Sequence, residues 1–524
     1  DKMKRFMYSL SHIINIQGNH IHEDLTGFYY KTTYPYIDER PIVRIISGDG
    51  GIKIGSSGKI VIESNDSIQL IKHVYIDNKL LFILLLGLGF TQTELTTRVY
   101  DVGTISVPGY STLLTELDIL ATHEENIKLI GLFKKLGYEV SEPIKGDIYK
   151  YRELKKHYKE KKIPLLASFE KNYRLGYSKK LVKVLRKRKN IILVGMGGSI
   201  LGTKALYSFL KQKIKKNFFF QDNLSERNIL ELNSKKFNKS AYIFISKSGN
   251  TIETVTNINL IIQNEKKNNT KVFITEKKNN AITEIANKLK AEIIEHKNFI
   301  GGRYSVMSEV GMLPAELMNL NVKKFKNLNY LINNKNFVNR LISNVSCLYD
   351  LSKQKILNSI ILSYDPDMND LGYWYQQLIA ESLGKKGKGF IPMVSIMPKD
   401  HHSLLQLYLD GPKINFFTIF ASRHQKKYRL SNYLIPKSIK YIAKKNLETV
   451  LYAQRKAMEN ALIKNRIPFR TFYFLKKREE ELGTIFTFFV LETILLSRLM
   501  KLNPFDQPAV ETVKQDTKKI LLKS

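Results

Sequence analysis

The chain has 524 residues, a formal net charge of +36 at pH 7 and a single cysteine, Cys347. This length allows about two to four domains with large buried cores. One cysteine excludes a disulfide framework and a cluster of thiolate metal ligands, and it suits a cytoplasmic location. The first residues show no cationic region followed by an apolar stretch and a cleavage site, so secretion is not expected.

The excess of positive charge comes mostly from lysines scattered along the whole chain, without a confined arginine-rich stripe. Specific nucleic-acid binding is therefore not expected, whereas a diffuse basic field attracts phosphorylated metabolites. Two apolar runs are candidates for membrane spans. Leu80–Phe90 is too short, and Thr484–Met500 is interrupted by Glu492 and Arg498. The second run predicts a buried helix, and no membrane association is expected.

Residues 1–150 predict a mostly antiparallel domain with a few helices. Short extended runs separated by glycine-rich turns support this, and they are Ile42–Ile46, Gly58–Glu63, Thr96–Val102 and Leu113–Leu120. Residues 151–184 predict a linker with a helical lead-in, because Lys145–Lys162 is strongly charged and poor in apolar residues.

From about residue 190 the pattern alternates between strands and helices. The expected strands are Asn190–Val194, Tyr242–Ile245 and Lys271–Ile274, and the helices between them are Ser199–Lys211, Ile252–Asn264 and Ala281–Lys290. A second set of strands follows at Ile356–Ser363, Phe390–Ile396, Lys413–Phe420 and Pro468–Phe474. The alternation predicts an α/β fold with two tandem doubly wound parallel sheets, one in residues 185–330 and one in 331–524.

A glycine-rich turn, Val194–Gly202, connects a predicted strand to a predicted helix. Glycines let the backbone approach a ligand, and the helix amino terminus presents unpaired N–H groups to an anion. The glycine spacing does not fit a dinucleotide turn. A tight strand-to-helix turn without a ligand explains this segment equally well.

A second polar turn, Ser246–Thr254, also follows a strand and opens a helix. Hydroxyl groups, one amine and helix-terminal N–H groups gather there, a set of donors that suits a phosphate monoester. The alternative is an ordinary N-cap within a polar loop. Two such turns in one α/β unit favour the phosphate.

Three further clusters carry groups for acid–base chemistry. Arg303 follows two glycines and offers a fixed cation for an oxyanion, although most arginines are surface residues. Gln377 and Glu381 are four residues apart on one helix, where a lone glutamate is usually solvated. In Asp400–Ser403 the two histidines are adjacent, so they diverge and do not chelate one metal ion, but one of them suits a general acid or base.

The segment Asn503–Lys514 brings Gln507, Glu511 and Lys514 to one face of a predicted short helix, at steps of four and three residues. An amide, a carboxylate and an amine on one face suit a polyhydroxylated anion. The commoner interpretation is a solvated face with an ion pair.

In this order the clusters resemble the phosphoglucose isomerase family, over roughly residues 185–524. The turn at 195–202, Ser246–Thr254, Gly301–Arg303, Glu381 with Ser382 and Gly384-Lys385, His402-Ser403 and Asn503–Lys514 carry the resemblance. One departure is Asn250, which stands where a threonine is usual. The resemblance implies two sugar-isomerase (SIS) domains and a cytoplasmic enzyme of glycolysis and gluconeogenesis. That enzyme interconverts glucose 6-phosphate and fructose 6-phosphate without a metal or other cofactor.

The resemblance also implies roles for single residues. The substrate phosphate would be held by the polar groups of the two turns, which are Gly198, Ser199, Ser246, Lys247, Ser248, Gly249, Asn250, Thr251 and Thr254. Glu381 would move a proton between C2 and C1 through a cis-enediol, and Arg303 would stabilise the enediolate. The resemblance also implies which residues open the sugar ring and orient the substrate, and it implies a homodimer.

His402, helped by Lys514, would open the pyranose ring by protonating the ring oxygen. Gln377 and Gln507 would orient substrate hydroxyls. The family is usually a homodimer in which each site takes a histidine from the partner chain, and the same is expected here.

Residues 1–150 resemble the CYTH, or triphosphate-tunnel, family on Leu84–Tyr100, Leu113–Ile119 and Leu136–Tyr138. The acidic alternating strand of that family is missing, and Thr96 stands where its lysine is expected. A degenerate binding or structural module is therefore the expectation, and its own triphosphatase activity is the alternative. Two other functions stay open for residues 185–524: an isomerase that also accepts mannose 6-phosphate, and a sugar-phosphate-binding regulatory protein.

Overall fold

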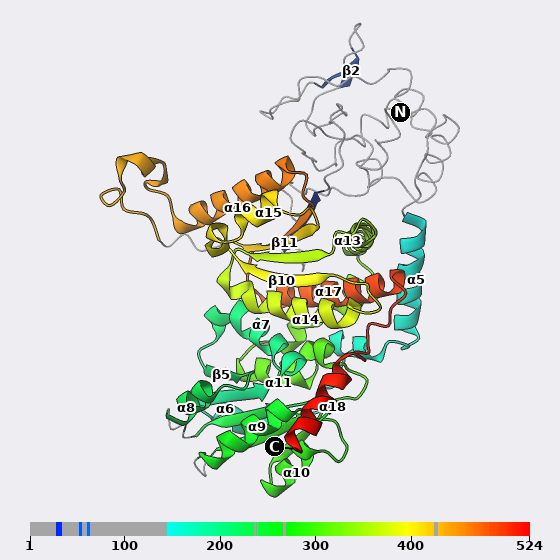
Figure 1. Ribbon diagram of the computed structural model, residues 1–524, viewed down its shortest axis with the longest axis vertical. Coiled ribbons are helices and arrows are strands. Elements are labelled where there is room, and N and C mark those ends of the chain that lie inside the picture. Colours follow the sequence, from blue (N-terminus) through cyan, green and yellow to red (C-terminus); the bar gives the residue numbers. More distant parts are fainter. Residues whose placement is uncertain are drawn as a thin grey trace. The chain divides into compact units, whose positions relative to one another are not determined.

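The computed structural model describes residues 28–33, 52–54, 60–62, 144–234, 237, 239–265, 269–423 and 428–523 (Figure 1). In the amino-terminal part, β1 spans Phe28–Thr33, and β2 (Ile52–Ile54) pairs antiparallel with β3 (Ile60–Ile62). The other strands predicted for residues 1–150, and the segments that resemble the CYTH family, lie outside the described residues.

The described residues form two compact units. One contains residues 29–33, 52–54, 60–62, 144–146 and 456–472, and the other contains residue 28 with 147–455 and 473–523. The second unit holds every cluster singled out in the sequence from residue 194 onward.

The first sheet of the larger unit has the strand order β5–β4–β6–β7–β8, and all neighbouring strands are parallel. Its strands are β4 (Asn190–Gly195), β5 (Asn217–Gln221), β6 (Ala241–Ile245), β7 (Thr270–Thr275) and β8 (Glu292–Glu295). Every residue of β4 and β6 is buried, because both are near-continuous apolar runs covered by helices on both faces. The doubly wound sheet predicted for this part is confirmed.

Helices surround this sheet (Figure 1). They are α6 (Lys179–Arg186), α7 (Leu201–Phe209), α8 (Glu226–Ser234), α9 (Ile252–Gln263), α10 (Ala281–Lys288) and α11 (Glu309–Leu317). Side chains fix where two of them begin: Ser178 accepts a hydrogen bond from Leu181 N at 3.0 Å, and Asn280 accepts one from Thr283 N at 3.0 Å. Ile258, Ile261 and Phe273 belong to the buried core beneath α9.

The second parallel sheet of this unit contains β10 (Ile391–Ile396), β9 (Asn358–Ser363) and β11 (Asn415–Ser422), in that order. The chain then continues through α16 (Leu447–Lys464) and β12 (Phe469–Phe474). The helices of this half are α12 (Leu328–Leu331), α13 (Lys335–Lys353), α14 (Asn369–Leu383), α15 (Leu405–Asp410) and α17 (Glu479–Leu499). Figure 1 shows α7 and α14 between the two sheets of the unit, and these helices contact each other.

Short 3-10 turns connect many of these elements. They are η2 (Pro164–Phe169), η3 (Gly197–Ser199), η4 (Lys211–Lys213), η5 (Gly302–Met307), η6 (Val322–Phe325), η7 (Pro366–Met368), η8 (Lys399–His402) and η9 (Lys437–Ile442). The charged segment near residue 150 forms the helix α5 (Ile144–Lys159).

Helix α17 contains the longest apolar run predicted to be buried. By length and composition alone it is apolar enough to cross a membrane, but 89% of its most apolar window lies inside the protein. Phe486 packs edge-on against Trp374 at 4.6 Å, and Phe489 stacks on Tyr375 at 3.9 Å between ring centroids. The expectation of a core helix is confirmed for this segment.

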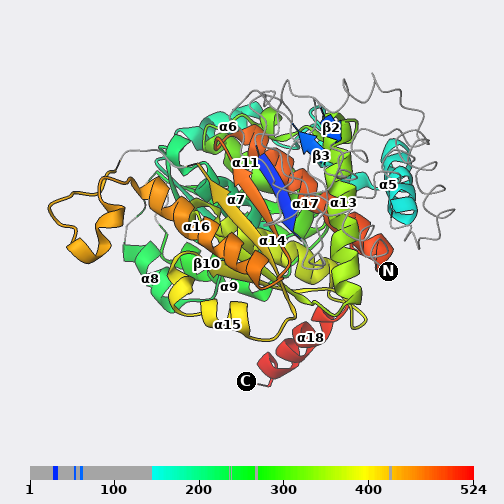
Figure 2. The same ribbon diagram turned by 90° about the horizontal axis from the view of Figure 1, so that it is seen from above.

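The chain ends in α18 (Val510–Leu521), which extends away from the neighbouring helices in Figure 2. None of its residues is buried. Gln507 precedes this helix rather than lying on it, so the predicted single face formed by Gln507, Glu511 and Lys514 is wrong. The cause is Pro508, since the residue before a proline is biased away from the helical conformation.

Candidate active site

The glycine-rich turn lies at the carboxyl end of β4 and leads through η3 into α7. Gly197 adopts a left-handed conformation with φ +51°. At Gly198 a Cβ atom would lie 2.1 Å from the carbonyl carbon of Gly302. The turn therefore touches the backbone of Gly302 and Arg303, and two clusters that are about a hundred residues apart in sequence come into contact.

The second turn lies beside the first, at the carboxyl end of the adjacent strand β6. Ser246 Oγ lies 2.9 Å from Thr251 Oγ1 and accepts a hydrogen bond from Gly249 N at 3.2 Å. Gly249 has φ +74°, and a Cβ atom there would collide with the Asn280 side chain. Glycine is thus required at this position for the turn to approach the Asn280 side chain.

One hydroxyl at the start of α9 has no hydrogen-bond partner among the described residues. Thr251 is the N-cap residue, but its side chain makes no capping hydrogen bond to the helix. Thr254 is fully buried, and within the described part of the chain its Oγ1 has no hydrogen-bond partner. An unpaired buried hydroxyl is costly unless a ligand binds it, so Thr254 Oγ1 favours the phosphate over an ordinary cap.

Lys247 is the amine of the second turn. Its Nζ donates to Asn298 O at 2.8 Å and lies 3.6 Å from Glu276 Oε1. Burial lowers the pKa of Lys247 and the nearby positive charges of Lys278 and Arg303 add to this, while Glu276 opposes it. The second turn therefore lies within the electrostatic field of Arg303.

Arg303 is buried, with only 4% of its surface exposed. Its Nε donates to Ser382 Oγ at 2.8 Å, and its Nη1 donates to Glu381 Oε2 at 3.1 Å and to Gln507 Oε1 at 3.0 Å. Its Nη2 donates to the carbonyl oxygens of Pro504 and Asp506. This set of acceptors fixes the plane of the guanidinium.

Glu381 lies in the last turn of α14, and 30% of its side chain is exposed. Its Oε2 faces Arg303, and its Oε1 accepts a hydrogen bond from Gln377 Nε2 at 2.8 Å. Gln377 Oε1 is buried, and no described residue donates a hydrogen bond to it. A Cβ atom on Gly197 would lie 2.6 Å from Gln377 Nε2, so α14 contacts the first turn here.

These contacts bring together Gly198, Arg303, Gln377, Glu381 and Gln507. The arrangement joins a carboxylate that can exchange a proton to a fixed cation, next to helix starts suited to an anion. These residues come from clusters that the sequence had singled out separately.

Two predicted residues are not part of this group. His402 is exposed on η8, whereas its neighbour His401 is bonded to the Tyr364 hydroxyl at 2.7 Å. Lys514 lies on the exposed helix α18 and pairs with Glu511 at 2.7 Å. Neither side chain has a contact with Glu381 or Arg303 among those described within one chain.

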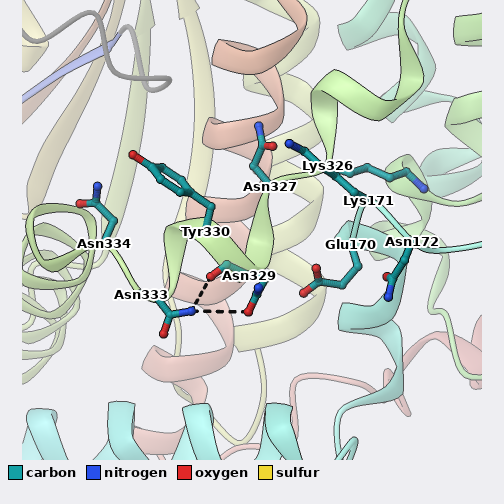
Figure 3. A pocket seen from close by; sticks show the side chains of 9 residues that line it. All are labelled: Glu170, Lys171, Asn172, Lys326, Asn327, Asn329, Tyr330, Asn333 and Asn334. Atoms are coloured by element: carbon teal, nitrogen blue, oxygen red, sulfur yellow. Dashed lines mark hydrogen bonds between the residues drawn. The ribbon is translucent and has the colours of Figure 1, made fainter.

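A cavity of about 720 Å³ lies elsewhere in the larger unit and contains none of the predicted site residues (Figure 3). Its lining is polar and consists of Glu170, Lys171, Asn172, Lys326, Asn327, Asn329, Tyr330, Asn333 and Asn334. Several of these amides take part in local turns, for example Asn333 Nδ2, which donates to Asn329 O at 2.7 Å. We assign this cavity no part in the chemistry around Arg303.

Within the part of the chain that the structure describes, no three histidine, cysteine, aspartate or glutamate side chains lie together in a way that could hold a metal ion.

The sequence singled out Ser382 and the segment Asn503–Lys514 but not their role in positioning Arg303, and it did not single out Tyr304. Tyr304 OH lies 2.9 Å from Ser382 Oγ and donates to Pro504 O at 3.0 Å, and its burial raises the pKa of the phenol, which keeps it protonated. The Asn-Pro pair at 503–504 signals a turn. However, no sequence pattern shows that the carbonyl groups of this turn accept from an arginine.

The two-sheet arrangement recurs in solved structures. A hypothetical protein from Thermus thermophilus superposes with a TM-score of 0.59 at 21% identity, covering 72% of this chain and 91% of that one. A glucose-6-phosphate isomerase from Chlamydia trachomatis gives a TM-score of 0.55 at 19% identity, covering 65% of this chain and 71% of that one. The chain therefore shares its fold with these α/β proteins.

Sequence comparison identifies the family. The phosphoglucose isomerase family model matches residues 165–524. A glucose-6-phosphate isomerase from Methanocaldococcus jannaschii is 33% identical over 345 residues, which cover 64% of this chain and 84% of that protein. The chain belongs to the phosphoglucose isomerase family.

Proposed function

We propose that this protein is an enzyme that interconverts glucose 6-phosphate and fructose 6-phosphate, with Glu381 as the proton-transferring base. One observation carries this proposal: the Glu381 carboxylate is held between the buried Arg303 guanidinium and Gln377, beside two helix starts suited to phosphate. Membership of the phosphoglucose isomerase family supports it.

The reaction requires that one proton move between neighbouring carbons. Glu381 takes the proton from C2 of the open-chain aldose, and the electron pair of the C–H bond forms the C1–C2 double bond while negative charge develops on O1. A proton moves from O2 to O1 through the enediol, and Glu381 returns its proton to C1. Atoms and electrons balance, since substrate and product are isomers.

Arg303 stabilises the enediolate. A guanidinium that is fixed before the reaction stabilises developing charge without reorganisation, and removal of such a donor typically lowers the rate by about 10²–10³-fold. The contacts of Arg303 with Ser382 and with the carbonyls of Pro504 and Asp506 support this role, because they hold the cation in place whether or not substrate is bound.

The substrate phosphate binds at the two turns. Helix-terminal N–H groups and the hydroxyls of Ser246, Thr251 and Thr254 supply donors, and Ser199, Lys247, Ser248 and Asn250 complete the polar wall. The unpartnered Thr254 Oγ1 and the absence of a side-chain cap on α9 support this assignment. Gln377 and Gln507 orient hydroxyls of the sugar next to Glu381.

Ring opening uses His402 from a second copy of the chain. His402 is exposed on η8 and has no described contact with Glu381, which is consistent with a site completed in a homodimer. His402 protonates the ring oxygen while the hydroxyl on C1 gives its proton to water, and Lys514 assists His402. Two observations support a cytoplasmic location for this dimer: the chain has a single cysteine, and it belongs to the phosphoglucose isomerase family.

A coupled assay tests the proposal. Purified protein is supplied with fructose 6-phosphate, and the glucose 6-phosphate formed is oxidised by an added NADP-dependent dehydrogenase. We expect turnover that is unchanged by a chelator. A parallel assay that starts from mannose 6-phosphate measures whether specificity is broader. If neither substrate is converted while sugar phosphates still bind, the chain is a sensor rather than an enzyme.

A further inference from the structure

Many of the hydrogen bonds that Arg303 donates are accepted by a short segment near the carboxyl terminus. The segment 503–507 provides three of its acceptors, namely Pro504 O, Asp506 O and Gln507 Oε1. This segment contains no helix or strand, since α18 begins only at Val510. Its geometry therefore depends on side-chain contacts, some of them within the segment, such as the bond from Phe505 N to Asn503 Oδ1 at 3.0 Å, and others from elsewhere.

Lys385 is placed to fix it. This residue follows α14 directly after Gly384, four residues beyond Glu381. Its Nζ donates to Asn503 O, to Asp506 O at 2.6 Å and to Asp506 Oδ1 at 2.6 Å. An ammonium group has three protons, so these acceptors use its full donor capacity.

Charge and burial strengthen the contact. The Lys385 side chain is 11% exposed, and the opposing Asp506 side chain is 51% exposed. Hydrogen bonding to Lys385 lowers the pKa of the Asp506 carboxyl, which keeps it ionised. Asn503 Nδ2 donates to the other carboxylate oxygen at 3.1 Å, so the turn is closed on both sides.

We propose that Lys385 is a positioning residue: by clamping the segment 503–507 through Asp506 and two carbonyl groups, it holds the acceptors that orient Arg303 toward the substrate. The proposal rests on the proposed isomerase function. Lys385 does not touch the reacting atoms. It couples the end of α14, which carries Glu381, to the segment that carries Gln507.

A clamp of this kind affects turnover more than substrate binding. The phosphate-binding turns at 195–202 and 246–254 have no contact with Lys385 among the described hydrogen bonds and ion pairs, so binding of the substrate phosphate stays intact. Arg303 stabilises charge that develops only in the transition state. A displacement of about 1 Å at such a group costs on the order of 10²-fold in rate.

The first experiment compares Lys385→Met with Lys386→Met, an exposed lysine on the same turn that serves as the matched control. We expect kcat for fructose 6-phosphate to fall about 10–100-fold in Lys385→Met while KM changes less than about twofold. The control variant should match the wild-type enzyme in both constants. Equal kcat values for the two variants would overturn the proposal.

Chemical rescue separates positioning from folding. The only natural cysteine, Cys347, is buried, so Lys385→Cys can be alkylated selectively with 2-bromoethylamine to restore an ammonium group of nearly the same reach. We expect the alkylated variant to regain most of its kcat, with treated wild-type protein as the control. A loss of kcat that alkylation does not restore would contradict the clamp.

Two further measurements cover other outcomes. Asp506→Asn keeps the shape of the side chain but removes its charge, and its effect should not add to that of Lys385→Met, because both break one clamp. Hydrogen–deuterium exchange of the peptide that contains residues 503–507 should rise in Lys385→Met and not in Lys386→Met. This readout does not need catalysis: unchanged exchange refutes the clamp, whereas an inactive wild-type protein refutes the proposed function.

Discussion

The contact between the glycine-rich turn and Arg303 makes a sharp prediction about two neighbouring glycines. A Cβ atom added at Gly198 would lie 2.1 Å from Gly302 C, 2.3 Å from Gly302 O and 2.5 Å from Arg303 N. All of these are backbone atoms, which cannot rotate away. At Gly302 the nearest atom to an added Cβ is Gly198 Cα at 3.9 Å, an ordinary contact.

Gly198→Ala must therefore push η3 and η5 apart by roughly 1 Å, which costs about 1–3 kcal/mol as overpacking. The shift moves Arg303 relative to Glu381, and we expect kcat/KM for fructose 6-phosphate to fall about 10²-fold. Gly302→Ala adds the same methyl group at the other side of the same contact. It should keep kcat/KM within about twofold of wild type.

Both variants are measured in the coupled isomerase assay, with thermal unfolding followed in parallel. Neither glycine has a positive φ, so backbone strain does not confuse the comparison. Equal activities for Gly198→Ala and the wild-type enzyme would show that the two segments do not meet as described. Equal losses in both variants would show that the effect is not steric.

Three other predictions concern single buried groups. Thr254→Val removes a hydroxyl without a described partner, so we expect an unchanged melting temperature. The KM for sugar phosphate should rise about tenfold, because hydrogen bonds to charged groups contribute about 1.5–3 kcal/mol. An unchanged KM would show that Thr254 does not bind the phosphate. Burial lowers the pKa of His296 to about 4, so the unfolded chain binds more protons than the native state between this value and 6.5. The free energy of unfolding should then fall as pH drops through this window, and His296→Gln should flatten that fall; identical pH profiles would contradict the assignment. Burial raises the pKa of Glu481 to about 8, so the native state binds more protons between 4.5 and 8 and loses stability as pH rises. Glu481→Gln should therefore stabilise the protein most at pH 8 and above, as measured by urea unfolding, and a variant less stable than wild type at that pH would refute this.

The sequence predicted the central strands well because their apolar runs are long and end in glycine or hydroxyl-rich turns. It missed β5 and β8 at the two edges of the first sheet. β8 has only the residues Glu292–Glu295, and two of the four are charged, so it carries little strand signal. Edge strands need fewer buried side chains, and their pattern is correspondingly weak.

The residues of the candidate site could be predicted from the sequence, but their arrangement in space could not. Arg303, Gln377, Glu381 and Gln507 were named from the sequence, and the structure brings them together. The sequence could not show which carbonyl groups bind Arg303, because every residue carries one. It also placed Gln507 on a helix that begins only after Pro508, since side-chain spacing was given more weight than the restriction before proline.

The most direct test of the account is the kinetics of Glu381→Gln. This substitution keeps the shape of the side chain and leaves one oxygen to accept from Arg303, but it replaces the oxygen that accepts from Gln377 with an NH2 group and removes the base. We predict that kcat for fructose 6-phosphate falls by at least about 10³-fold, while the dissociation constant for the sugar phosphate changes less than about threefold. A Glu381→Gln enzyme that turns over at close to the wild-type rate would contradict the account.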